Sequence, residues 1–328
     1  MPSIQGMPIA PFVTALLLAA STVSAAITID TVFVGDAGNA NDTTGYGSVG
    51  YNYHIGTHEV TNSQYTAFLN AVAATDTHDL YNSEMGTNAF GGISQSGTNG
   101  SFNYSTKADM ANKPVNYVSF WDAARFANWL TNGQGSGDTE TGVYELTSAG
   151  ISNNSITRNN TAFNNGGVAV ASENEWYKAA YYDGNGSYYD YPTQSDTEPQ
   201  AEDPPGGINS ANFSNAVDGG SVTQVGAYTN SISHYGTFDQ GGNQNEWTDQ
   251  IFESDPSKRA LRGGSFNGDG DFLRSLTQGK AEPTIQVGHV GFRVTSLAPI
   301  PEPSSYGAIF GIVGLATAIF FRRKRRRG

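Results

Sequence analysis

Three short stretches of the chain carry the polar pattern with which α-helices begin, and this pattern limits the fold more than any other feature. Each starts with a hydroxyl residue and has a polar side chain three positions later, as in Thr61–Gln64, Ser119–Asp122 and Ser172–Glu175. In such a capping box each side chain accepts a backbone N–H of the other residue. The chain is therefore predicted to form a helix after each of these starts.

Apolar residues follow each start at helical spacing. The three sets are Tyr65, Phe68, Leu69 and Val72, then Ala123, Phe126, Ala127 and Leu130, then Trp176, Ala179 and Ala180. Residues three and four apart share one face of a helix, so these sets predict helices packed on a core. The second helix is expected to end near Asn132 and Gly133, because Asn and Gly are typical of a helix C-terminus.

Short apolar stretches between glycine-rich and asparagine-rich segments indicate β-strands. The clearest are residues 51–55, 259–265 and 290–294. The chain has 40 glycines among 328 residues, which favours long turn-rich connections over regular elements. We find no long-period repeat between Ala26 and Ala298, so a single domain of the α+β class is expected over residues 26–298.

Composition excludes several classes of function. The formal net charge is -13, and six of the 17 basic residues fall within residues 322–327, so the rest of the chain is strongly acidic. An acidic surface repels phosphate backbones, and we expect no nucleic-acid partner. The chain contains no cysteine, which rules out disulfides, thiolate metal sites and thiol catalysis.

Six motifs occur in a fixed order along the chain. They are Glu59–Tyr65 (EVTNSQY), Lys113–Ala124 (KPVNYVSFWDAA), Ser172–Trp176 (SENEW), Gly242–Trp247 (GNQNEW), Arg262–Phe266 (RGGSF) and Gly291–Val294 (GFRV). Together they resemble the motifs of the formylglycine-generating enzyme, or sulfatase-modifying factor, family over roughly residues 50–296. The resemblance implies that family's fold, which is related to C-type lectins and has little regular secondary structure.

The same resemblance makes the segment after the Arg-Gly-Gly-Ser motif informative about activity. In the family, two cysteines in this segment bind copper and activate oxygen, and the alignment places Gly268 and Leu273 at their positions. Neither side chain can bind a metal, so the family's oxidation of cysteine is not expected here. The segment is predicted to be scaffold, with Arg262 anchoring a strand end and Phe266 filling the core.

Iron chemistry and hydrolysis are not favoured by the residue pattern either. A 2-His-1-carboxylate iron site needs two imidazoles that converge on one point, and His54 and His58 lie too far apart along one predicted strand. The family's iron-dependent relatives carry their ligands in an additional helical domain that has no counterpart here. Ser265 lacks the strand, elbow and helix context of a hydrolase nucleophile.

Calcium is the cofactor that remains open. Hard cations prefer carboxylate, amide and backbone carbonyl oxygens, which an acidic chain rich in Asn and Gly offers. The structural calcium sites of the family map onto two sets of residues. They are Asn212, Phe213, Asp218 and Gly220 for one ion, and Gly241, Gly242, Gln244 and Glu246 for the other. For Asn212 and Asp218 an Asx-turn without a metal is the alternative.

The N-terminal end of the chain indicates export. Residues 11–23 are apolar, and Ser24 and Ala25 complete a small-residue cleavage site. This arrangement predicts a signal peptide over residues 1–25, although no basic residue precedes the apolar run.

The C-terminal end has three parts in order: Pro301-Glu302-Pro303, the apolar run 306–321 and a basic cluster. This order resembles the PEP-CTERM sorting signal, which we assign to residues 299–328 with a transmembrane helix over 306–321. The resemblance implies an exosortase-type transpeptidase as partner and a transient anchor in the inner membrane. It further implies delivery to the cell envelope or to an extracellular matrix that contains exopolysaccharide.

Two functions follow as expectations. The first is a non-catalytic binding or structural module at the cell surface, in which exposed tyrosines could stack on sugars. These are Tyr181, Tyr182, Tyr188, Tyr189 and Tyr191. The second is an oxidoreductase-like enzyme of the same family with altered chemistry, since a fold alone does not fix function. Bound calcium alone would favour the module, and stoichiometric iron or copper would favour the enzyme.

Overall fold

Two four-stranded sheets form the centre of the protein, and each combines strands from distant parts of the sequence. A computed structural model describes residues 26–300 of the chain. The first sheet has the order β1-β2-β12-β5, and the second has the order β10-β9-β8-β11. The strands are β1 Thr31–Val34, β2 Tyr53–Gly56, β5 Ala169–Val170, β8 Asn245–Ile251, β9 Arg259–Arg262, β10 Gly279–Ala281, β11 Val290–Phe292 and β12 Val294–Ser296.

The strands of both sheets pair antiparallel, except that β8 and β11 are parallel. Two smaller pairs lie outside these sheets. They are β3 Ile93–Ser96 with β4 Asn103–Thr106, antiparallel, and β6 Gln200–Ala201 with β7 Ser210–Ala211, parallel.

All three predicted helix starts are confirmed, each with both hydrogen bonds of a capping box. The helices are α1 Asn62–Val72, α3 Phe120–Thr131 and α6 Glu173–Tyr181. The predicted end near Asn132 is also confirmed, because Asn132 is the C-cap of α3. Shorter helical segments are α2 Glu84–Thr87, α4 Ser148–Ser152, α5 Asn160–Asn164 and the 3-10 turn η1 Gly270–Leu273.

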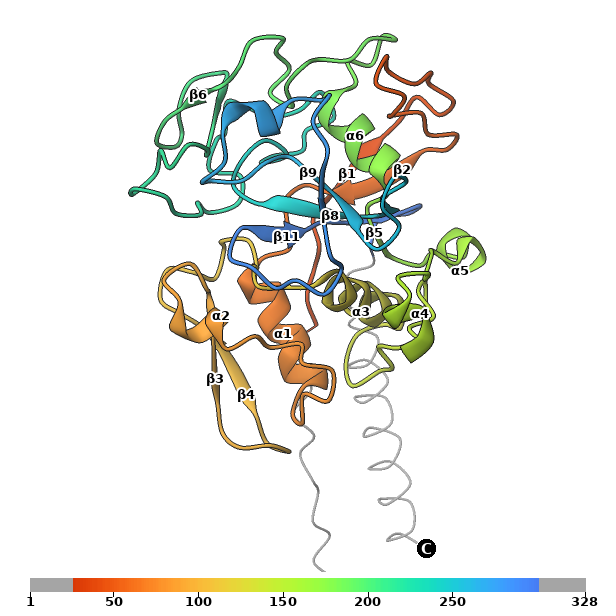
Figure 1. Ribbon diagram of the computed structural model, residues 1–328, viewed down its shortest axis with the longest axis vertical. Helices are drawn as coiled ribbons and strands as arrows, with labels where there is room; N and C mark the ends of the chain where they lie inside the picture. The colour runs from red at the N-terminus through yellow and green to blue at the C-terminus, as the bar shows by residue number, and fades with distance from the viewer. Residues whose placement is uncertain (1–25, 301–328) are drawn as a thin grey trace, which may run out of the picture.

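The sheets lie between helices on two sides. Figure 1 shows α1 and α3 on one side and α6 on the other. On the first side Phe126 of α3 meets Phe292 of β11, with ring centroids 5.5 Å apart. On the other side Trp176 and Tyr177 of α6 are fully buried in a second apolar cluster with residues of β1 and β2. The prediction of helices packed on a core is therefore confirmed.

Two of the predicted strands are shorter in the structure than expected. Residues 259–265 were expected as one strand, but β9 stops at Arg262 because Gly263 and Gly264 adopt φ values of 94° and 70°. A side chain at Gly263 would lie 2.8 Å from the Gln240 carbonyl oxygen, so this turn requires glycine. The expected strand 290–294 is divided at Arg293, where the chain passes from the second sheet to the first.

The two predicted membrane-related segments lie outside the described part of the chain. They are the signal peptide, predicted over residues 1–25, and the transmembrane helix, predicted over residues 306–321. Between residues 26 and 300, none of the helices has the length and apolar character needed to cross a bilayer.

Candidate functional site

Arg262 closes the base of the loop that follows β9. The side chain is buried, and its Nε donates to the Glu173 carboxylate at the start of α6. Its Nη1 donates to the carbonyl oxygens of Ser275 and Thr277, each at 2.7 Å. The prediction that Arg262 anchors a strand end is confirmed, and so is the burial of Phe266, which is 2% exposed.

The loop places Gly268 and Leu273 in very different surroundings. Leu273 has no exposed surface and belongs to an apolar cluster with Tyr191, Ala211 and Phe213. Gly268 is partly exposed, and a Cβ built on it would meet its nearest neighbours at 3.5 Å, an ordinary contact distance. The two positions that the sequence alignment assigns to the family's cysteines therefore hold a partly exposed glycine and a buried aliphatic side chain.

Behind this loop lies a buried ion pair that joins two motifs. Arg293 and Glu246 are both fully buried. Arg293 donates from Nε to Glu246 Oε2 and from Nη2 to Oε1, each at 2.6 Å, and Trp176 Nε1 donates to Oε2 at 2.8 Å. Such a bidentate pair fixes both side chains and satisfies the carboxylate without a metal.

This geometry bears directly on the second predicted calcium set, formed by Gly241, Gly242, Gln244 and Glu246. A cation there would compete with Arg293 for the only carboxylate of the set. The sequence suggested a metal ligand at Glu246, but the structure gives this residue an arginine partner. Calcium at this set stays a prediction, and the ion pair disfavours it.

The first predicted calcium set has a feature that fits a cation. Asn212 is 1% exposed, and its Oδ1 accepts no hydrogen bond from the residues that the structure describes. Its Nδ2 donates to the Ser221 carbonyl at 2.8 Å, which holds the amide in place. Phe213 and Gly220 are buried, whereas Asp218 is exposed with a φ of 47°. Within residues 26–300 no three His, Asp or Glu side chains gather to hold a metal, so an ion here would depend on carbonyl oxygens.

Two acidic residues near Arg293 were not found by sequence reasoning. Glu59 is 2% exposed, and its Oε1 accepts from Asn243 Nδ2 at 3.1 Å, while Oε2 has no donor among residues 26–300. Burial, then the charges of Asp239 and Glu246, raise the pKa of Glu59 well above its usual range. Burial also raises the pKa of Asp239 to about 6. The sequence offered one signal that Glu59 is a site residue, namely that it is charged and is the first residue of the first motif.

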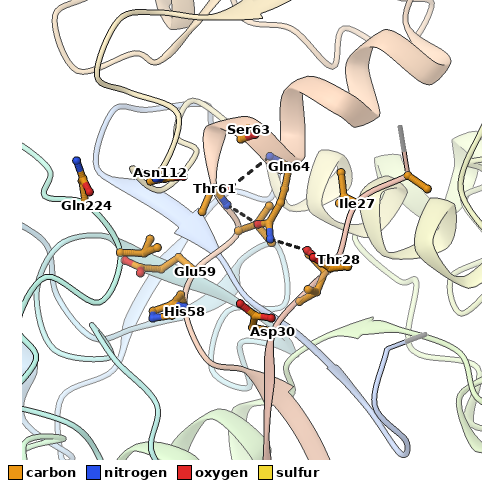
Figure 2. Close-up of a pocket in the computed structure, with 14 residues that line it drawn as sticks. Ile27, Thr28, Asp30, His58, Glu59, Thr61, Ser63, Gln64, Asn112 and Gln224 are labelled. Carbon is orange, nitrogen blue, oxygen red and sulfur yellow. Dashed lines mark hydrogen bonds between the residues drawn. The ribbon is translucent and has the colours of Figure 1, made fainter. Parts of the chain in front are cut away.

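Glu59 also lies at the edge of a pocket of about 540 Å³, drawn in Figure 2. Asp30 and His58 line the same pocket, and Gln64 bridges its wall by donating to the Thr28 carbonyl at 2.9 Å. Burial and the charge of Arg293 lower the pKa of His58 to about 4, so its imidazole is neutral at pH 7. The pocket thus combines a neutral imidazole with two carboxyl groups.

The two histidines considered for iron pack against different aromatic rings. His58 stacks on Phe238 with ring centroids 5.2 Å apart, and His54 meets the edge of Phe33 at 5.5 Å. Each of the two imidazoles therefore packs against a different aromatic side chain.

The expectation of exposed tyrosines is wrong for three of the five residues. Tyr181, Tyr182 and Tyr191 are buried, and only Tyr188 and Tyr189 are partly exposed. Tyr181 donates its hydroxyl to the Leu273 carbonyl at 3.0 Å, which ties α6 to the loop after β9. Tyr181 at the end of α6, and Tyr182 and Tyr191 after it, therefore cover the core with their rings.

The protein has a small centre of regular sheets and capped helices, and long loops extend from it. The loop after β9, whose base Arg262 closes, is one of them. Residues 39–297 match the family model described as the sulfatase-modifying factor enzyme 1-like domain. The chain belongs to this family, which confirms the resemblance drawn from the six motifs. A comparison with curated proteins found no match.

Solved structures with this fold share little sequence with the chain. Treponema denticola variable protein 1 is 20% identical with a TM-score of 0.50, over 84% of this chain and 93% of that one. CarF is 22% identical with a TM-score of 0.52, over 82% and 98%. PvdO from Pseudomonas aeruginosa is 17% identical with a TM-score of 0.46, over 84% and 92%. At such identities the first two comparisons establish a shared fold alone.

Proposed function

We propose that this protein is an exported, non-catalytic binding or structural module built on the sulfatase-modifying factor domain. The proposal is carried by the loop after β9, where the alignment drawn from the motifs puts Gly268 and Leu273 at the positions of the family's cysteines. The copper-dependent oxidation of the family uses the thiolates of two cysteines, and the chain contains no cysteine. Leu273 instead lies in an apolar cluster, which is the environment of a packing residue.

Export and delivery to the cell surface form the second part of the proposal. Residues 1–25 would act as a signal peptide, and residues 299–328 would direct the chain to an exosortase-type transpeptidase that removes the anchor. Support comes from the order of the sequence features at each end. Intact-mass measurement of the protein from its native host tests this part, because residues 322–328 must be missing from the mature form.

Calcium would serve a structural role at Asn212, Phe213, Asp218 and Gly220. The support is the buried Asn212 oxygen without a donor, since leaving such a group unsatisfied costs about 1–3 kcal/mol. In this arrangement Asn212 and Asp218 would supply side-chain oxygens, and the loop backbone would supply carbonyls.

Metal analysis combined with an oxidation assay tests the non-catalytic role. Purified protein should contain calcium but no stoichiometric iron or copper. When it is incubated with a cysteine-containing sulfatase peptide, oxygen and copper, it should form no formylglycine. Turnover of the peptide would refute the proposal directly.

An oxidoreductase-like enzyme with altered chemistry is the second candidate function. The pocket in Figure 2 favours it, because His58, Asp30 and Glu59 place an imidazole and two carboxyl groups around one space that a substrate could enter. Stoichiometric iron or copper in the purified protein would favour this candidate over the module.

A further inference from the structure

A second pocket, of about 280 Å³, lies where four separate segments meet beyond the end of β8. Tyr46 comes from the loop before β2, and Glu173 and Asn174 come from the first turn of α6. Phe252 and its neighbours follow β8, and Gln278 directly precedes β10. This pocket shares no lining residue with the one in Figure 2.

Glu173 provides a buried carboxylate in the lining of this pocket. It is 2% exposed, pairs with Arg262 and accepts the Thr248 hydroxyl at 3.2 Å. A carboxylate has about four acceptor positions on its two oxygens, so these two partners leave room for further hydroxyl donors. The Arg262 guanidinium holds the Glu173 carboxylate in place without itself lining the pocket.

Side-chain amides add hydrogen-bond donors. Asn174 accepts the Gly47 N–H at its Oδ1, 2.9 Å away, which leaves Nδ2 as the free end of the amide. Neither Asn174 Nδ2 nor Gln278 Nε2 donates to any residue between 26 and 300. Two oriented amides and a fixed carboxylate therefore border one small space.

Two aromatic rings complete the lining, and both are held in position. Tyr46 packs against Tyr177 with ring centroids 6.0 Å apart, and the Arg262 guanidinium lies 4.9 Å from the Tyr46 ring centre. Phe252 lies under the Lys280 ammonium group, 4.7 Å from its ring centre. That ammonium faces Asp255 at 3.8 Å. The rings therefore offer fixed apolar surface.

We propose that this pocket binds a neutral saccharide unit. Sugar hydroxyls both donate and accept, which matches the Glu173 carboxylate and the two amides, and the C–H face of a sugar ring matches an aromatic ring. Among the described residues, the lining contains Glu173 and Glu253 but no Lys or Arg, and the cations packed on its rings, Arg262 and Lys280, already pair with Glu173 and Asp255. An uncharged sugar is therefore favoured over a phosphate or a uronate. The volume is close to the lower end of small-ligand pockets, roughly 300–1,000 Å³, which suits one or two sugar rings.

The inference rests on the proposed binding role and names its ligand class. Saturation-transfer NMR on the mature protein tests it with cellotriose as a neutral probe and trigalacturonate as an anionic one. Cellotriose should bind with a Kd of about 1 mM, and trigalacturonate should bind at least about tenfold more weakly. Equal binding of both probes, or no binding of cellotriose at about 20 mM, would overturn the inference.

Matched variants locate the binding. Gln278→Ala and Asn174→Ala should each raise the Kd for cellotriose about tenfold or more, because each removes one amide from the pocket. Gln224→Ala removes an amide from the other pocket and should leave the Kd unchanged. An equal effect of Gln224→Ala and Gln278→Ala, at unchanged melting temperature, would contradict this location. If cellotriose fails to bind while the protein lacks oxidase activity, the saccharide site is refuted and the non-catalytic role stands.

Discussion

The guanidinium of Arg293 and the carboxylate of Glu246 meet through two hydrogen bonds of 2.6 Å in a fully buried position. Breaking such a pair leaves an uncompensated charge in the interior, so Glu246→Gln should lower the free energy of unfolding by about 3–5 kcal/mol. Urea denaturation measures this loss. Since the partner is an arginine, the loss should be equal in calcium and in chelator.

Arg293→Met completes the comparison. The double variant Glu246→Gln with Arg293→Met should lose less than the sum of the two single variants, because the two residues share one interaction. A loss for Glu246→Gln that appears only in calcium would instead make Glu246 a metal ligand.

Asp239→Asn should change how stability depends on pH. Burial raises the pKa of Asp239 from 3.8 to about 6 in the folded protein. Between these values the folded state holds a proton that the unfolded state has lost, so stability from this group falls as pH rises from about 4 to about 6. The variant has no such group and should gain about 3 kcal/mol over the original protein between pH 4 and pH 7, since each pKa unit is worth about 1.4 kcal/mol.

Urea denaturation at a series of pH values measures the gain for Asp239→Asn. The exposed substitution Asp269→Asn is the control for removing a carboxyl group from the surface. A constant difference for Asp239→Asn would show that its carboxyl titrates alike in both states.

Thr61→Ala should destabilise α1. The Thr61 hydroxyl accepts the Gln64 N–H at 3.2 Å, and Gln64 Oε1 accepts the Thr61 N–H at 2.9 Å. Losing an N-cap hydroxyl costs about 1 kcal/mol, which thermal unfolding detects as a lower Tm. Ser63→Ala, on the exposed face of the same helix, should change the Tm by much less.

Restoring cysteines should restore at most a metal site. In Gly268→Cys with Leu273→Cys, the first thiol has space, since a Cβ there makes only ordinary contacts. The second should cost about 1–3 kcal/mol, because it removes volume from the apolar cluster around Leu273. The double variant is expected to bind Cu(I) in a competition titration with a chromophoric chelator. A folded double variant that binds no Cu(I) would show that the alignment of the loop is wrong.

Asp218→Asn tests calcium at the Asn212 set. Because a ligand that binds only the folded state raises stability, calcium should raise the Tm of the original protein. The substitution removes the charged oxygen of the set, so the Tm gain on adding calcium should shrink by at least about half. Asp269→Asn serves again as the exposed control. An unchanged gain in Asp218→Asn would exclude Asp218 as a ligand.

Local features of this fold could be predicted, and contacts between distant segments could not. The three capping boxes depend on residues three positions apart, so they can be recognised from the sequence alone. Arg293 and Glu246 are 47 positions apart, and no pattern in the sequence around either residue indicates that the two are paired. The same applies to the end of β9 at Gly263, where the neighbour that excludes a side chain is Gln240.

The burial of residues in the loops could not be predicted from the sequence either. Tyr191 and Leu273 lie 82 positions apart, yet they share one apolar cluster. A tyrosine in a glycine-rich and serine-rich stretch resembles a surface residue until its partner is known. The family motifs gave the loop's place in the fold, but only packing showed that Leu273 fills an apolar space.

The passage of one continuous segment through both sheets has a consequence for how the protein opens. Residues 290–296 contribute β11 to one sheet and β12 to the other, and Arg293 at the junction also donates to the Phe238 and Gly56 carbonyls. Neither sheet can separate from its neighbours without straining this junction. Backbone amides of both sheets should therefore exchange with deuterium at a common slow rate, as parts of a single cooperative unit, while the outer loops exchange early.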